Sequence, residues 1–177
     1  MGRPRSIDRD KILDIAERIV REEGATALTF DAVAKAAGIT KGGLQYCFGS
    51  KDDLIAALAD RWLKGFDAEI VRHTPPNGNG VDRARAYVTA SARIDEVTQA
   101  KMAGMLVSLL QSPGHLEQAR GWYAEWMKRL EPGSEGERRA RTAFFAAEGA
   151  FFLRSLGLVE MDQAGWDVVF DDILKLL

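Results

Sequence analysis

The sequence predicts an all-α fold of about nine helices, and three observations lead to that prediction. Apolar residues recur at helical spacing through most of the 177-residue chain. Capping residues open these stretches, and glycine or proline breaks close them. The 5 prolines cluster between the expected helices, where a missing backbone donor does no harm. With 46% hydrophobic residues, the chain can bury a substantial core.

The first expected helix runs from about Ser6 to Glu23 and ends at Gly24, with its apolar residues on one stripe. A longer helix opens at Lys51, because Ser50-Lys51-Asp52-Asp53 reads as a capping box. From there on, the expected helices are Lys51 to His73, Asp82 to Ile94, Val97 to Leu110, Leu116 to Leu130, Glu135 to Leu156 and Gln163 to Leu177.

Two short helices joined by a tight turn are expected between Thr29 and Phe48. Thr29 and Thr40 are good N-caps for the two helices. Gly38 is expected to end the first helix in the left-handed conformation, with Ile39 folding back as in a Schellman cap. This turn length and this glycine are typical of a helix-turn-helix, whose second helix enters the major groove of DNA. An ordinary helical hairpin is the alternative.

The stretch from about residue 6 to residue 62 resembles the TetR/AcrR family of bacterial transcriptional regulators. The resemblance rests on Gly24, Thr29, Val33-Ala34, Ala37-Gly38-Ile39, Lys41-Gly42, Leu44, Phe48, Ser50, Lys51 and Leu54. The chain departs from the family pattern at Gln45, where tyrosine is most common, and at Cys47, where histidine or tyrosine is usual. Both positions are expected to face DNA, so the operator sequence cannot be taken from a relative.

The resemblance implies a ligand-responsive regulator, most often a repressor that a small hydrophobic effector releases from a palindromic operator in double-stranded DNA. It implies a helix-turn-helix DNA-binding domain at residues 1–50 and a helical ligand-binding and dimerisation domain at residues 51–177. A homodimer built from the last two long helices is implied as well. The alternative is a helical interaction module that has lost specific DNA binding, an alternative that Gln45 and Cys47 favour.

The DNA-reading surface is expected on the helix from Lys41 to about Cys47. Gln45 can form a bidentate pair with an adenine edge, while Gly42 and Gly43 let the backbone approach the groove. The full set of candidate DNA contacts is Arg3, Arg5, Thr29, Thr40, Lys41, Gly42, Gly43, Gln45, Tyr46, Cys47 and Lys51. For Arg3 and Arg5, a solubilising tail is an equal alternative. Residues 1–51 carry nine Lys and Arg against seven Asp and Glu, which suits an end that meets phosphate.

Most of the aromatic residues lie in the second half of the chain, and bulky aromatic and methionine side chains suit a hydrophobic ligand. The candidate ligand-binding residues are Trp62, Phe66, Tyr87, Met102, Met105, Leu109, Trp122, Trp126, Phe145, Glu148 and Phe152. Core packing is the alternative for each aromatic residue. Glu148 lies among phenylalanines on one helix, so it can face a cationic ligand, stay solvated, or pair with Arg141 or Arg154.

The expected helix from Glu135 to Leu156 is apolar on two sides. Phe144 and Phe151 lie on one side, and Phe145 and Phe152 lie on the other. Such a helix must bury both sides, one in its own subunit and one against a partner. Small residues at positions 146, 149 and 150 permit close helix approach, so a four-helix bundle across a two-fold axis is expected. Burial of both sides within a monomer is the alternative.

Other classes of function find little support in the sequence. His73 and His115 lie far apart without a metal-ligand partner at i+3 or i+4, so we expect no enzyme, metal or cofactor. No apolar run approaches the roughly eighteen residues of a membrane span, and the single cysteine suits the cytoplasm. Cys47 is either a small packing residue or, with Lys51 one turn further on, a thiol whose oxidation changes DNA binding.

Overall fold

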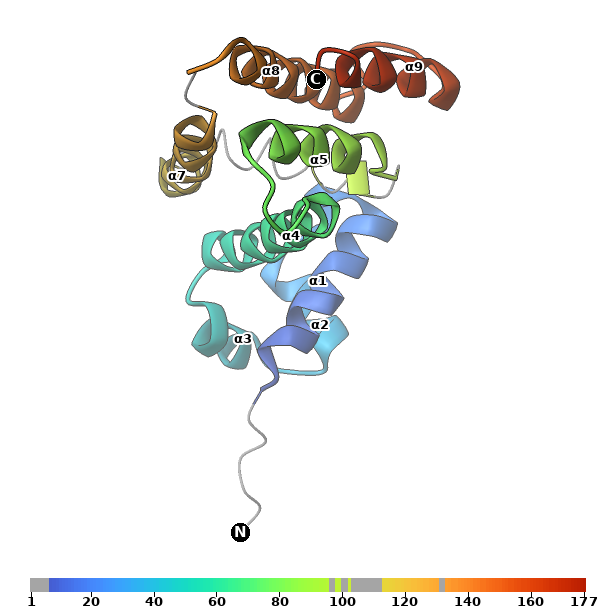
Figure 1. Ribbon diagram of the computed structural model, residues 1–177. Coiled ribbons are helices and arrows are strands. Elements are labelled where there is room, and N and C mark those ends of the chain that lie inside the picture. The colour runs from blue at the N-terminus through green and yellow to red at the C-terminus, as the bar shows by residue number, and fades with distance from the viewer. Residues whose placement is uncertain (1–6, 96–97, 100–101, 103–112, 131–132) are drawn as a thin grey trace.

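A computed structural model describes residues 7–95, 98–99, 102, 113–130 and 133–177 of the chain. The described residues are helical and contain no strand, which confirms the all-α fold (Figure 1). The helices are α1 (Arg9–Glu23), α2 (Phe30–Ala37), α3 (Lys41–Phe48), α4 (Lys51–His73), α5 (Gly80–Ala92), α7 (Pro113–Arg129), α8 (Glu135–Ser155) and α9 (Gln163–Leu174), with a 3-10 turn η1 (Ala25–Ala27) after α1. The helix expected at Val97–Leu110 falls almost wholly outside the described residues.

The predicted caps open the helices of the first half. Thr29, Thr40 and Ser50 each accept a hydrogen bond from the backbone N–H three residues further on. The capping box expected at Ser50 is half formed, because the backbone N–H of Ser50 donates to the carbonyl of Phe48 and not to the carboxylate of Asp53. That carboxylate accepts from the Ser50 hydroxyl at 2.7 Å. The predicted start and end of α4 are confirmed.

The first helix begins later than expected. Asp8 is its N-cap and accepts hydrogen bonds from the backbone N–H groups of Asp10 and Lys11, so α1 starts at Arg9 and not at Ser6. A carboxylate at this position satisfies orphan donors of the first turn and complements the helix dipole.

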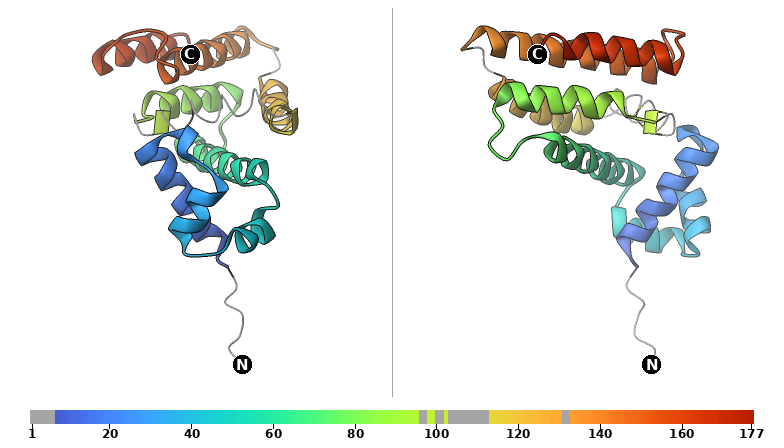
Figure 2. Two further views of the ribbon diagram at one scale, coloured as in Figure 1. Left: turned by 180° about the vertical axis from the view of Figure 1, so that it is seen from behind. Right: turned by 45° about the vertical axis from the view of Figure 1, so that its right-hand side comes forward.

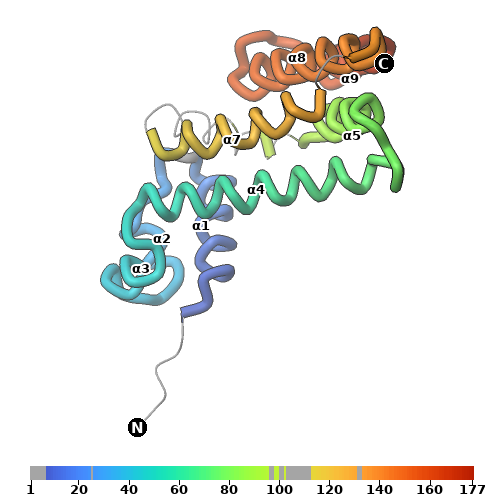
Figure 3. The backbone as a smooth tube through the Cα atoms, turned by 60° about the vertical axis from the view of Figure 1, so that its left-hand side comes forward, coloured from blue at the N-terminus to red at the C-terminus, as the bar shows by residue number. Residues whose placement is uncertain are grey.

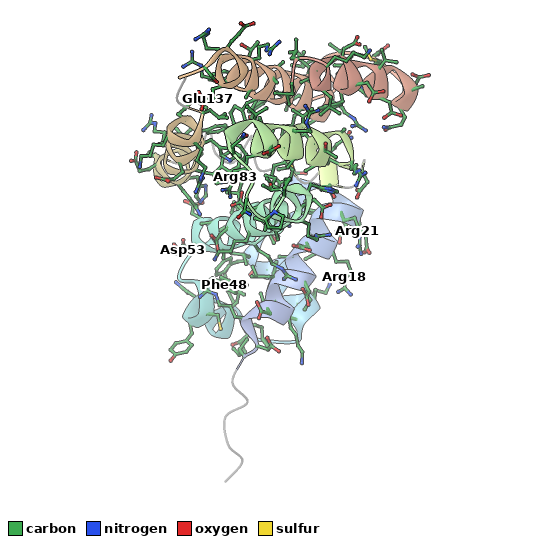
Figure 4. All side chains as sticks on the ribbon, viewed as in Figure 1. Arg18, Arg21, Phe48, Asp53, Arg83 and Glu137 are labelled. Carbon is green, nitrogen blue, oxygen red and sulfur yellow. The ribbon has the colours of Figure 1, made fainter. Side chains whose placement is uncertain are left out.

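The helices of the second half shift by a few residues for similar reasons. Asn79 and Asp82 form a complete capping box, so α5 starts at Gly80 and not at Asp82. Ser134 and Glu137 form the box that opens α8, and Figure 4 shows Glu137 at that helix start. The helix α7 starts at Pro113, three residues before the expected Leu116, as proline is tolerated in a first turn.

The first three helices and the first turns of α4 pack into one unit, called the head here. Its core is formed by Ile12, Leu13, Ala16, Ile19, Val20, Leu28, Val33, Ala34, Leu44, Phe48, Leu54 and Leu58. Gly38 ends α2 with a φ of 65°, and the N–H of Ile39 donates to the carbonyl of Ala34 at 3.0 Å. The predicted Schellman cap is therefore confirmed, and it sets the sharp turn between α2 and α3.

The remaining helices form a layered body (Figure 2). The pair α8 and α9 makes the outer layer, α5 lies beneath the pair, and α4 lies beneath α5. The fully buried Phe144 and Phe170 join these layers, and Trp126 of α7 packs against them. No helix in the described part of the chain is both long and apolar enough to cross a membrane.

The helix α4 belongs to both units. Figure 3 shows it leaving the head and running beneath α7 and α5 to the far end of the body. Its Leu54 and Leu58 are buried in the head core, whereas its Ile70 is buried in the body core. A polar contact also holds α4 to the head, since Arg61 of α4 donates to Asp14 of α1 at 2.5 Å.

Candidate functional site

The helix α3 presents a polar face to solvent because its apolar residues are committed to the head core. Leu44 and Phe48 are buried, as the sequence predicts. Gln45 and Tyr46 are exposed, and Tyr46 keeps 92% of its surface accessible. The face that carries Gln45 and Tyr46 is therefore free to contact another molecule.

A contact that the sequence pattern did not indicate fixes α3 against α1. Arg9 donates from Nη1 to the backbone carbonyl of Cys47 at 2.8 Å, and its guanidinium lies 4.4 Å from the ring centroid of Phe48. Such a cation–π contact holds the end of α3 at a fixed angle to the first helix. Figure 4 shows Phe48 directed from α3 toward the rest of the head.

Three of the expected DNA contacts already have partners within the head, and one of them is Thr29, whose hydroxyl accepts from the backbone N–H of Ala32. Lys41 forms an ion pair with Asp31 of α2 at 3.0 Å, and both side chains remain exposed. The hydroxyl of Thr40 accepts from the backbone N–H of Gly43. All three residues still reach solvent, so their expected roles toward DNA stay predictions. Lys51 is exposed at the first position of α4, where unpaired backbone N–H groups also favour an anion.

The two glycines of α3 have different surroundings. A side chain at Gly42 would meet nothing within 4 Å, which leaves this backbone open to a close approach. A Cβ at Gly43 would lie 3.1 Å from the Cδ1 atom of Ile7. Gly43 is therefore half-buried against the residues before α1, and packing within the head alone favours glycine there.

Cys47 is half-buried and packs against the head core, which favours the packing role over the redox role. Arg3 and Arg5 lie outside the described residues, and their expected phosphate contacts remain predictions.

A second candidate site is a cavity of about 430 Å³ in the body, between α4, α5, α7 and α8. Six of the predicted ligand-binding residues line it, namely Phe66, Tyr87, Met102, Trp122, Glu148 and Phe152. Its size and its aromatic and aliphatic lining are those of a site for one small apolar molecule. That these six residues bind a ligand remains a prediction.

Three predicted ligand-binding residues lie elsewhere. Trp126 is buried against Phe144 in the body core, so the alternative of core packing holds for it. Trp62 donates from its indole to Glu17 of α1 at 2.6 Å and joins the head to the body. Phe145 is 56% exposed on the outer side of α8 and faces away from the cavity. Met105 and Leu109 lie outside the described residues.

Several lining residues were missed by sequence reasoning. The buried Phe151 lines the cavity together with Phe152, although the pattern assigned it to the opposite side of α8. His115, Ser91 and Tyr123 also line it. The only signal for Tyr123 is its position one residue after Trp122, and Ser91 lies in an alanine-rich helix that suggests packing alone.

Glu148 is the carboxylate of the cavity, and it is only 9% exposed. The hydroxyl of Tyr123 donates to its Oε2 atom at 2.5 Å. Burial raises the pKa of Glu148 to about 8, because removal from water disfavours the charged form. Burial likewise raises the pKa of Tyr123 to about 12. At neutral pH, Glu148 therefore carries its proton in most molecules.

Hydrogen bonds join the wall of the cavity to α4. The Nε2 atom of His115, at the start of α7, lies 3.2 Å from the carbonyl oxygen of Asp52 in the first turn of α4. Further along, the indole of Trp122 donates to the carboxylate of Asp67 at 3.2 Å. The helix α7 is thus fastened to the first turn of α4, which directly follows α3, and to a later turn of α4 at Asp67.

Comparison with known proteins relates both halves of the chain to one family. The family described as "Bacterial regulatory proteins, tetR family" matches residues 12–58, and "Tetracyclin repressor-like, C-terminal domain" matches residues 81–177. An uncharacterised HTH-type transcriptional regulator of Xanthobacter autotrophicus is 33% identical over 82 residues, which are 46% of this chain and 40% of that protein.

Two further similarities extend over most of the chain. The HTH-type transcriptional regulator BetI of Rhizobium meliloti is 23% identical over 161 residues, covering 85% of this chain and 79% of BetI. The solved structure of the multidrug binding protein EbrR, complexed with imidazole, has the same fold, with a TM-score of 0.69 and 21% identity over 96% of this chain and 94% of EbrR. The chain belongs to the TetR family of bacterial regulatory proteins, which are helix-turn-helix transcriptional regulators.

The buried carboxyl group gives a pH-dependent stability that can be measured. The folded protein keeps the Glu148 proton up to about pH 8, whereas the unfolded chain loses it near its ordinary value of 4.5. The free energy of unfolding therefore falls between these two values as the pH rises, by up to about 1.4 kcal/mol per pH unit. Glu148→Gln removes this titration. In denaturant melts, the free energy of unfolding of the variant should therefore rise relative to that of the wild type as the pH increases across the same window.

Glu117→Gln is the matched control, because Glu117 is an exposed carboxylate on α7 that pairs with Arg120. Its difference from the wild type should stay nearly constant with pH. Parallel pH profiles for Glu148→Gln and the wild type would contradict the burial of a protonated Glu148.

Proposed function

We propose that this protein is a homodimeric repressor that binds a palindromic operator through its two heads and leaves it when a small apolar effector fills the body cavity. The observation that carries the proposal is the double role of α4, which packs into the head core and also lines the cavity with Ala59, Leu63 and Phe66. An effector that moves this wall of the cavity acts on the same helix that supports α3. Such a protein acts on DNA in the cytoplasm.

The exposed polar face of α3 supports operator binding. Gln45 is exposed on α3, where it would meet a base edge, and Lys51 is exposed at the start of α4, where it would meet a phosphate. In a dimer, two such heads would read half-sites about one helical turn apart. The family of the chain supports the same role.

The cavity supports an effector of small-molecule size. The likeness to the multidrug binding protein EbrR, which has also been solved with malachite green, agrees with this reading at the level of the fold. The cavity opens between helices of one subunit, so each subunit of the dimer would hold its own effector.

The outer layer of the body supports dimerisation. Phe145 and Leu153 of α8 are exposed large apolar residues, and Val168 of α9 is another. Large apolar residues exposed on two neighbouring helices are what a helix-to-helix interface between subunits would cover. The exposed Gly149 lies between these residues on α8, and no neighbouring atom would contact an added Cβ there.

Selection of DNA from a random pool tests the proposed function. Purified protein should enrich one inverted-repeat sequence, and a gel shift with that duplex should give one complex with two subunits per duplex. If selection enriches no sequence over several rounds, the chain is instead an interaction module that has lost specific DNA binding.

Gly149→Arg should convert the dimer into monomers, since it places a bulky charge in the apolar surface formed by α8 and α9. Sedimentation velocity at micromolar concentration measures the change. Gly121→Arg is the matched control, because Gly121 is also an exposed helical glycine with open space around it, but it lies on α7. A dimeric Gly149→Arg variant would contradict this interface.

Gln45→Ala should relax the preference at one base pair per half-site, by about 1–3 kcal/mol, because a bidentate pair with one base edge is lost. Lys51→Ala should weaken binding to all sequences alike and flatten the salt dependence, because it removes a phosphate contact. Fluorescence anisotropy with the selected duplex and its point variants measures both effects.

Lys64→Ala is the control for charge alone, because Lys64 is exposed on α4 and pairs with Asp60. It should leave DNA binding unchanged. An equal loss on all sequences for Gln45→Ala would reduce Gln45 to a phosphate contact.

A further inference from the structure

The body cavity is apolar apart from a few polar groups. Its described lining residues include no lysine and no arginine. Three of its polar side chains come from different helices: Ser91 from α5, Tyr123 from α7 and Glu148 from α8. A buried carboxylate stays charged when a cationic side chain pairs with it. Where no cation is near, burial raises its pKa and the group takes up a proton. Glu148 falls in the second case, because its described partner is a tyrosine hydroxyl.

A second polar group of the cavity, the Ser91 hydroxyl, has no hydrogen-bond partner among the described residues. Ser91 is 2% exposed. A buried hydroxyl that makes no hydrogen bond costs free energy in the empty protein. Among the described residues, the cavity therefore holds a carboxyl group with no cationic partner and a hydroxyl with no hydrogen-bond partner. A ligand with a charged N–H group can satisfy both.

The aromatic lining suits the same kind of ligand. Phe66 and Tyr87 meet edge to face with ring centroids 5.4 Å apart, and Tyr87 and Trp122 have centroids 6.3 Å apart. Trp122 also meets Tyr123 at 5.0 Å. All four of these aromatic residues line the cavity, and an aromatic ring attracts a cation that lies over its face.

We infer that the effector is a lipophilic amine bound as its ammonium ion, whose N–H donates to the Glu148 carboxylate while its apolar body lies against the aromatic lining. Before binding, Glu148 is a neutral carboxyl group in the cavity and the ammonium ion is in solvent. Binding forms a carboxylate–ammonium pair in the cavity and releases the Glu148 proton to solvent. The inference rests on the proposed function only in calling the cavity the effector site.

The other ionisable groups that face the cavity are few. The helix α5 contributes Tyr87 and α7 contributes His115 and Tyr123, while the lining residues of α4 are all apolar. His115 lies near the carbonyl oxygen of Asp52 and is the group whose protonation has to be separated from that of Glu148. His115→Gln serves that purpose.

Three matched probes test the inference: 2-(2-naphthyl)ethylamine as the cation, 2-(2-naphthyl)ethanol as the neutral molecule and 2-naphthylacetate as the anion. Their binding to the full-length protein without DNA is measured by isothermal titration calorimetry. The wild type should bind the cation at least about ten-fold more tightly than the alcohol, because a hydrogen-bonded charge pair forms only with the cation. The anion should bind most weakly.

Glu148→Gln keeps the size of the side chain and removes its charge. It should weaken binding of the cation by about ten-fold or more and leave binding of the alcohol unchanged or tighter. Glu117→Gln should bind all three probes as the wild type does, because Glu117 is exposed on the outer side of α7. Retained binding of the alcohol shows that the variant still folds around its cavity.

The pH dependence gives an independent readout. Alkylammonium groups stay charged below about pH 9, so between about pH 6 and pH 7.5 only the protein titrates. Affinity for the cation should rise by about ten-fold per pH unit and level off above the Glu148 pKa of about 8. At about pH 7, calorimetry in buffers of different ionisation enthalpy should report release of about one proton. His115→Gln should keep both effects, and Glu148→Gln should abolish them.

Equal affinity of Glu148→Gln and the wild type for the cation would overturn the inference, as would tighter binding of the alcohol than of the cation by the wild type. Neither result bears on operator binding, which is measured separately on the same variants. Loss of operator binding with intact cation binding would instead count against the proposed regulator.

Discussion

The shared helix α4 is the constraint on which the rest of the structure depends. Its first turns complete the head core, its middle turns line the cavity and its last turns enter the body core. Close-packed interiors transmit displacement because neighbouring side chains cannot yield independently. A shift of the cavity wall must therefore be absorbed by α4 or passed to the head, and the contact between His115 and the first turn of α4 favours the second route.

The fold and the head could be predicted from the sequence, because their signals are local. Thr29, Gly38 and Thr40 act through backbone atoms within a few residues, so their roles can be read without knowing the tertiary structure. The helix α1 starts at Arg9 and not near Ser6, because the side chain of Asp8 caps it in the folded chain. The contact between Arg9 and Cys47 joins residues 38 apart, and no local pattern indicates it.

The cavity could be predicted only in part, because the sequence pattern of a bulky aromatic residue is the same whether the residue lines a cavity or fills a core. Trp122 and Trp126 are one helical turn apart, yet one lines the cavity and the other is buried against Phe144. The sequence placed Glu148 among aromatic residues but left open whether it was solvated or paired. Its burial and its tyrosine partner come from the packing of α7 on α8, which sequence spacing does not encode.

Hydrogen exchange of the protein with and without the operator duplex obtained by selection tests the central claim most directly, because it needs no knowledge of the effector. If α4 couples the two sites, operator binding should change amide exchange in the cavity-lining turns around Ser91 of α5 and Trp122 of α7 as well as in the head. Changes confined to α1, α2, α3 and the first turn of α4 would contradict the account, since the cavity would then be insensitive to DNA bound at the head.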